Sequence, residues 1–266
     1  MNEPFLATGL SKTCYQEELS KLQLELCHVQ EWAALSRERA IIALEGRNST
    51  GKKRIARALT AQVSPNILRR VHLPKRTERE DAQLFMQRYA PHFPAYGEIV
   101  VFSPSWYRQA TAEFVLGLCT YEQHCHFLET CPLAEKYLID AGIRLIKLWV
   151  EMGPESQERR LAARLADPLR RWKVEESDLE LYRRRYDFSK ARDRIFEYTD
   201  TDYAPWHIVH MDDERRGTLN ALHHIIAQFP YQAVERARPK LPSRPESHSY
   251  DDYASIATRS VVPEKY

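Results

Sequence analysis

Hydrophobic and polar positions alternate along most of the chain in blocks that predict a regular succession of helices and strands. Between Leu19 and Val29, apolar residues recur at steps of three and four, which predicts an amphipathic helix over 15–35. The continuous apolar run 40–44 (AIIAL) is typical of a strand buried on both faces, as strands of parallel sheets are. The chain therefore opens with a helix and a central strand.

The same alternation continues as far as residue 227. Strands are predicted at 68–73, 98–102, 143–150 and 206–210. Helices are predicted at 53–62, 77–89, 106–118, 121–141, 155–165, 177–198 and 213–227, with Thr77 as an N-cap and Glu80 completing a capping box. Strands separated by helices at this rhythm predict an α/β fold, in which a doubly wound, mostly parallel sheet lies between two layers of helices.

The domain organisation follows from where the strands stop. No strand is predicted between residues 155 and 198, and a helical pair inserted there is typical of a lid. We expect residues 1–235 to form one domain that includes this lid. Residues 236–266 are rich in proline, serine and charged residues, which predicts a flexible tail.

Composition excludes some classes of protein. The 39 basic and 37 acidic side chains give a net charge of +2, which offers no argument for a nucleic-acid-binding protein. No secretory leader and no apolar run of membrane-spanning length is visible. The five cysteines are odd in number and include no CxxC pair, so we expect free thiols and a cytoplasmic protein.

Basic residues are concentrated in 159–173 and again in 183–185. A charged run of this kind is commonly the solvated face of a helix. A cationic surface that binds a polyanion is the alternative, and charge alone does not decide between them.

The segment 46–52 (GRNSTGK) matches the G-x-x-x-x-G-K part of a Walker A phosphate loop. Glycines allow the backbone to turn tightly so that its N–H groups face phosphate oxygens, and Lys52 supplies a mobile positive charge. The motif follows an apolar strand and precedes a helix, as this mechanism requires. Position 53 is lysine instead of the serine or threonine that ligates Mg²⁺ in such loops, so Lys53 and Arg54 add two cations there.

With the loop in place, the order of other segments resembles the family-2 polyphosphate kinases over about residues 15–227. The matching segments are 45–47 (EGR), 51–52 (GK), 73–75 (LPK) with 77–80 (TERE), 105–107 (SWY), 167–173 (DPLRRWK), 187–189 (DFS), 199–200 (TD), 204–206 (APW) and 212–213 (DD). The resemblance implies a P-loop fold and a reaction that moves phosphoryl groups between inorganic polyphosphate and nucleoside mono- or diphosphates. It also implies Mg²⁺ as cofactor, an arginine-rich lid and a possible homo-oligomer. Polyphosphate and adenine or guanine nucleotides are the implied partners, with no nucleic acid and no membrane.

The resemblance also assigns roles to individual residues. Lys52 and Arg47 are the implied catalytic cations, with Asn48 and Ser103 at positions where the family has aspartates. The implied phosphate- and nucleotide-binding residues are Gly46, Ser49, Thr50, Gly51, Lys52, Lys53, Lys75, Arg79, Arg108, Arg170, Arg171 and Lys173.

Asn48 and Ser103 each lack the charge of an aspartate, which weakens the attraction for a hard cation such as Mg²⁺. Three hypotheses remain open. The chain is a polyphosphate:nucleotide phosphotransferase of reduced or altered activity, or it is a non-catalytic relative that binds polyphosphate or nucleotide or partners an active subunit. An unrelated P-loop nucleotide kinase is the third hypothesis, and the joint order of the motifs argues against it.

Overall fold

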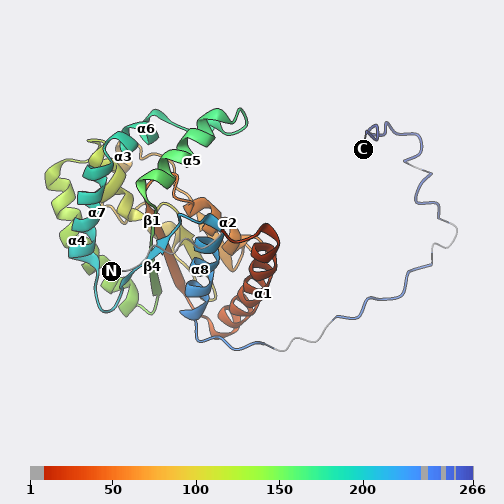
Figure 1. The fold of residues 1–266 in the computed structure, drawn as a ribbon. Coiled ribbons are helices and arrows are strands. Elements are labelled where there is room, and N and C mark those ends of the chain that lie inside the picture. The colour runs from red at the N-terminus through yellow and green to blue at the C-terminus, as the bar shows by residue number, and fades with distance from the viewer. Residues whose placement is uncertain (1–8, 235–238, 247–249, 255, 266) are drawn as a thin grey trace. The chain divides into compact units, whose positions relative to one another are not determined.

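A computed structural model gives the fold (Figure 1). The chain divides into two units, Met1–Val234 and Glu235–Tyr266. The structure describes residues 9–234, 239–246, 250–254 and 256–265. In the second unit, the described residues form turns and segments without regular secondary structure.

The first unit is built on a five-stranded sheet in which every neighbouring pair is parallel. The strand order is β2-β3-β1-β4-β5, so β1 lies in the middle. All seven residues of β1 are buried, as its unbroken apolar pattern predicts. The strands are β1 (Ala40–Gly46), β2 (Leu68–Val71), β3 (Ile99–Phe102), β4 (Arg144–Glu151) and β5 (Trp206–His210).

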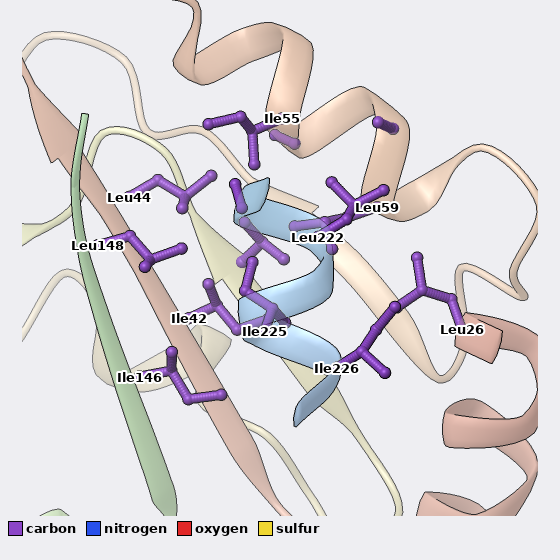
Figure 2. Packing of buried hydrophobic residues seen from close by; sticks show 14 of the residues in the cluster. Leu26, Ile42, Leu44, Ile55, Leu59, Ile146, Leu148, Leu222, Ile225 and Ile226 are labelled. Carbon is purple, nitrogen blue, oxygen red and sulfur yellow. The ribbon is translucent and has the colours of Figure 1, made fainter. Parts of the chain in front are cut away.

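One face of the sheet is covered by α1 (Lys12–Ser36), α2 (Lys52–Thr60) and α8 (Glu214–Ala227). Helix α8 packs between the strands and α1, so that Leu222, Ile225 and Ile226 contribute to one apolar core (Figure 2). Leu26 of α1 belongs to the same core, which explains the apolar stripe of this helix without a second subunit.

The other face of the sheet carries α4 (Tyr121–Asp140) and α7 (Arg185–Thr199) over a core rich in aromatic rings. Lys147 of β4 is fully buried there, and its Nζ donates to Glu135 Oε2 at 2.9 Å and to the carbonyl oxygen of Thr199 at 2.6 Å. The carboxylate of Glu135 also accepts from the Tyr107 hydroxyl, so the buried charges are satisfied by hydrogen bonds.

The segment predicted as a lid, called the lid region below, consists of α5 (Pro154–Ala166), a short turn of 3₁₀ helix η4 (Arg171–Lys173) and α6 (Glu176–Arg183), which leads into α7. The single helix predicted over 177–198 is wrong in this respect. Arg184 leaves helical geometry (φ −93°, ψ 31°), and the chain restarts as α7 at the next residue. The apolar periodicity did not show this break, because Leu181 of α6 and Phe188, Ala191 and Ile195 of α7 are buried at steps of seven, three and four across it.

Two further predicted helices are shorter than expected. Thr77 caps α3 (Glu78–Asp81) and Glu80 completes the capping box as predicted, but the helix ends at Asp81 instead of near Tyr89. The segment predicted as a helix over 106–118 forms a 3₁₀ turn, η2 (Trp106–Arg108), and a π-helical turn, η3 (Gln109–Glu113). Another 3₁₀ turn, η1 (Ala90–His92), precedes β3. Among the helices of the described residues, none has both the length and the apolar character that a membrane span requires.

Candidate phosphate-binding site

The segment 46–52 turns sharply between β1 and α2, and its two glycines are required by geometry. Gly46 has φ +136°, and a Cβ there would lie 2.1 Å from the carbonyl oxygen of Val150 on the neighbouring strand. Gly51 has φ +103° and is the N-cap residue of α2, where a Cβ would meet the side chain of Met211 at 2.5 Å. Ser49 also adopts a positive φ of 67°. The motif thus forms the strand–turn–helix unit that phosphate binding requires.

Lys52 begins α2 and bends back over the loop. Its Nζ donates to the carbonyl oxygen of Gly46 and, at 2.7 Å, to that of Arg47. Burial lowers the pKa of the Lys52 ammonium to about 8, although the negative charge of Glu45 opposes the shift and the positive charge of Arg108 adds to it. Among the residues that the structure describes, no carboxylate lies within ion-pair distance of this ammonium, so a phosphate in the loop would stabilise its charge.

Glu45 is buried at the end of β1, directly before the loop. Its Oε1 accepts from the backbone N–H of Gly46, and its Oε2 accepts from the N–H and the hydroxyl of Ser105 at 3.2 and 3.1 Å. Burial raises the pKa of Glu45, with Lys52 acting in the opposite direction. The carboxylate therefore fastens β1 to the segment that follows β3.

Arg47 points away from the loop towards α7. Its Nε donates to Glu151 at 2.8 Å, its Nη1 to the carbonyl oxygen of Arg185 at 2.8 Å and its Nη2 to the Ser189 hydroxyl at 2.6 Å. Its guanidinium also lies over the ring of Phe188. In this arrangement Arg47 joins the loop to α7.

Asn48 donates through Nδ2 to the Asp178 carboxylate in the first turn of α6. The carbonyl oxygen of Asn48 accepts from Gln157 Nε2 at 3.4 Å. An amide here can make a hydrogen bond to Asp178 that an ionised aspartate could not make. The loop is thereby linked to the lid region by a donor at position 48, where the resemblance implied an aspartate.

Two lid arginines also contact the loop directly. Arg164 Nη1 donates to the Ser49 hydroxyl at 3.0 Å. Arg160 Nη1 donates to the carbonyl oxygen of Thr50 at 3.4 Å and pairs with Glu214 at 3.2 Å. Helix α5 therefore brings positive charge to the rim of the loop, as the basic concentration in 159–173 suggested.

Ser103 lies at the carboxyl end of β3, on the same edge of the sheet as the loop, because β1 and β3 are parallel neighbours. The residue is buried, and its carbonyl oxygen accepts from His72 Nδ1 at 3.0 Å and from Arg70 Nη2 at 3.2 Å. The position predicted from the family pattern is thus at the correct edge, with a neutral side chain.

The remaining predicted cations have different surroundings. Arg108 pairs with Glu113 at 3.4 Å and is close enough for its charge to act on Lys52. Arg170 pairs with Asp167 at 2.9 Å, and Lys75 approaches Glu175 at 3.9 Å. Lys53, Arg79, Arg171 and Lys173 are exposed.

The lid surface near Lys75 is partly acidic. An open hollow of about 810 Å³ there is lined by Lys75, Ser177 and the three glutamates Glu175, Glu176 and Glu180. The structure therefore brings Arg160 and Arg164 to the loop, and does not bring Arg170, Arg171 or Lys173 into hydrogen-bonding contact with it in the part of the chain that is described.

Comparison with known proteins agrees with this geometry. A family model described as Polyphosphate kinase 2 (PPK2) matches residues 9–237. The chain belongs to the polyphosphate kinase 2 family.

Individual relatives support this membership across the chain. ADP-polyphosphate phosphotransferase 3 of Rhizobium meliloti is 39% identical over 252 residues, which cover 95% of this chain and 88% of the relative. GDP-polyphosphate phosphotransferase of Mycobacterium tuberculosis is 41% identical over 236 residues, covering 89% and 80%. A solved structure from Pseudomonas aeruginosa PA01, described as a candidate polyphosphate kinase 2, superposes with a TM-score of 0.76 at 25% identity. The match covers 83% of this chain and 47% of that longer chain.

The residues around the loop do not fit the Mg²⁺ ion that the polyphosphate kinase 2 family implies. Asn48 presents an amide N–H to Asp178, and both oxygens of Glu45 accept hydrogen bonds. Within the described residues, no three histidine, cysteine, aspartate or glutamate side chains are grouped so that they could hold a metal ion. We therefore assign no step of the reaction to a metal held by this loop.

Sequence reasoning missed several residues that contact the loop. Glu151, Gln157 and Asp178 were not singled out, because each is a single polar residue more than 100 positions from its partner in the loop. Arg160, Arg164 and Arg185 belonged to the basic runs, but the runs did not indicate which arginines face the loop. For Arg160 and Arg164, the only available signal was their spacing of four, which places both side chains on the same face of α5.

Proposed function

We propose that this chain is a polyphosphate:nucleotide phosphotransferase. The observation that supports it most is Lys52, which lies at the start of α2 with its ammonium over the turn of a phosphate loop. The relatives named above are phosphotransferases that act, by their names, on polyphosphate with ADP or GDP. Family membership and loop geometry together favour the same chemistry here.

The proposed reaction needs little from the protein beyond position and charge. A terminal oxygen of the nucleotide attacks the terminal phosphorus of polyphosphate. A new P–O bond forms, the P–O bond to the rest of the chain breaks, and the shortened chain leaves with the electron pair. Both oxygens are ionised phosphate oxygens, so no proton has to be transferred. Lys52, Arg160 and Arg164 would offset the negative charge in the transition state.

A second hollow is a candidate for the nucleoside. It has a volume of about 550 Å³ and lies between α7 and the segment that leads into α4. In its wall, the rings of Phe114 and His124 stack with centroids 3.8 Å apart, and Lys190 stands at its edge. Flat rings beside a cation suit a base that carries phosphates. The hollow begins next to Glu113, the partner of Arg108.

A direct test is chromatographic detection of the nucleotide with one added phosphate after incubation with polyphosphate and Mg²⁺ or Mn²⁺. ADP and GDP should give the triphosphate, and AMP and GMP the diphosphate. We expect product with the wild type and a loss of at least about 100-fold for Lys52→Ala, the scale for removing one preorganised charge. Lys21→Ala, on the outer side of α1, is the matched control and should retain full activity. No product with any nucleotide would refute the proposal.

The alternative function is a non-catalytic protein that binds polyphosphate or nucleotide, or that partners an active subunit. The observation in its favour is the neutral pair Asn48 and Ser103, at positions where the family has aspartates. Under this alternative the wild type binds polyphosphate without turnover. Activity should then appear when Asn48→Asp and Ser103→Asp are combined, and no gain would show that other positions also block the reaction.

A further inference from the structure

Glu151, the last residue of β4, is the centre of a group of arginines beside the phosphate loop. Its Oε1 accepts from Arg47 Nε at 2.8 Å and lies 3.9 Å from Arg185 Nη2. Its Oε2 accepts from Arg192 Nη1 at 2.9 Å. One arginine comes from the loop and two come from α7, so three separate side chains converge on a single carboxylate.

The carboxylate is fully occupied by these contacts. Oε2 also accepts from Trp149 Nε1 at 3.0 Å, and Oε1 accepts from the backbone N–H of Met152 at 3.1 Å. Burial alone would raise the pKa of Glu151, but the hydrogen bond from Trp149 and the charge of Arg47 outweigh it, so the pKa is lowered. Glu151 is therefore ionised at neutral pH.

The arginine group still carries excess positive charge. Arg192 has a second acidic partner in Asp193, at 2.7 Å. Within the described residues, Arg47 and Arg185 have no acidic partner within ion-pair distance other than Glu151, and their remaining hydrogen bonds go to neutral groups. One carboxylate thus faces more guanidinium charge than it can neutralise. Such a group retains an attraction for a further anion.

We propose that Glu151 acts as a built-in counter-anion of these arginines, and that a phosphate chain entering the loop competes with it. This inference rests on the proposed function, because it concerns the same polyphosphate substrate. A carboxylate and a phosphate are alternative partners of a guanidinium group, since each offers two oxygens that can accept hydrogen bonds from two of its N–H groups. The side chain of Glu151 is 15% exposed, and those of Arg185 and Arg192 are 14% and 24% exposed, so the group is open to solvent on one side.

The competition makes Glu151 a residue that sets the affinity for the anionic substrate. Removing its charge should leave the arginines positioned by their other hydrogen bonds, while the competing anion is lost. Glu151→Gln should therefore bind tripolyphosphate about tenfold more tightly than the wild type, which is the scale of one hydrogen bond to a charged group. A residue with a purely structural role would show the opposite sign.

The experiment is isothermal titration calorimetry of the full chain with tripolyphosphate. Glu98→Gln is the matched control, because Glu98 pairs at 2.7 Å with Arg69 of β2, away from the loop. The affinity of this control variant for tripolyphosphate should equal that of the wild type. Circular dichroism should first show that each variant is folded. Equal or weaker binding by folded Glu151→Gln would overturn the inference.

A second variant covers the case in which Glu151→Gln does not fold. Glu151→Asp keeps the charge but withdraws it by one methylene, and should tighten binding by about threefold; unchanged or weaker binding would again count against the inference. This outcome can be told apart from a failure of the proposed function. The proposed function is refuted if no nucleotide product forms, whereas the inference about Glu151 is tested by the affinity for tripolyphosphate. If Glu151→Gln binds tripolyphosphate more tightly but neither it nor the wild type forms product, the role of Glu151 as counter-anion is supported and the proposed phosphotransferase activity is refuted.

Discussion

The lowered pKa of Lys52 makes phosphate binding depend on pH in a way that can be calculated. Burial lowers this pKa to about 8, so the ammonium loses its proton within an accessible pH range. Lys52 attracts phosphate through its charge only when it is protonated, and a bound anion must raise its pKa again by linkage. Raising the pH from 7 to 9 should therefore weaken binding.

The magnitude follows from the pKa. With a value of about 8, roughly one molecule in ten is deprotonated at pH 7 and roughly ten in eleven at pH 9. If the protonated form alone binds, the dissociation constant should rise about tenfold over this interval. Binding at pH 9 should also take up close to one proton per ligand.

Calorimetry with tripolyphosphate in buffers of different ionisation enthalpy measures both quantities. Lys52→Arg is the control, because its guanidinium stays protonated throughout this range. The ligand titrates identically in both experiments, so the difference between the two proteins isolates Lys52. The same pH dependence in the wild type and in Lys52→Arg would refute the reasoning.

Three further predictions concern single contacts. Asn48→Asp places a second carboxylate against Asp178, so we expect a lower melting temperature and a recovery on addition of millimolar Mn²⁺; unchanged stability without metal would speak against the contact. Lys147→Met strands the buried carboxylate of Glu135 and should cost about 3–5 kcal/mol in urea unfolding. A cost below about 1 kcal/mol would contradict this burial. Gly46→Ala should destabilise the fold by at least about 2 kcal/mol, because its Cβ would overlap the carbonyl oxygen of Val150, and wild-type stability would disprove the close approach.

The sequence predicted the fold well where the burial of an element determines its pattern of apolar and polar residues. The fully apolar run 40–44 and the run that ends at Phe102 became neighbouring central strands, because only strands covered on both faces lack polar positions. The patterns failed where a local backbone change interrupts a continuous apolar face. The break at Arg184 has this origin, because buried residues continue at helical spacing from Leu181 to Ile195 across it.

The candidate site was predicted only in part, for a different physical reason. Lys52 and Gly51 stand within one local motif, whose chemistry fixes their spacing. Glu151 and Asp178 contact the loop only because the fold brings distant segments of the chain together, and the spacing of residues along the sequence does not indicate such contacts. Arg47 was expected at the phosphate from the motif, and its contacts with Glu151 and with Ser189 of α7 could not be read from the motif.

The central claim is that the backbone of residues 46–52 wraps a phosphate group beneath the arginines of α5. A crystal structure of the wild type with bound tripolyphosphate tests it most directly. The account predicts that a terminal phosphate accepts hydrogen bonds from the loop N–H groups and from Lys52 Nζ, with Arg160 or Arg164 turned towards it. Tripolyphosphate bound elsewhere, with Lys52 still donating to Gly46 and Arg47, would contradict the account.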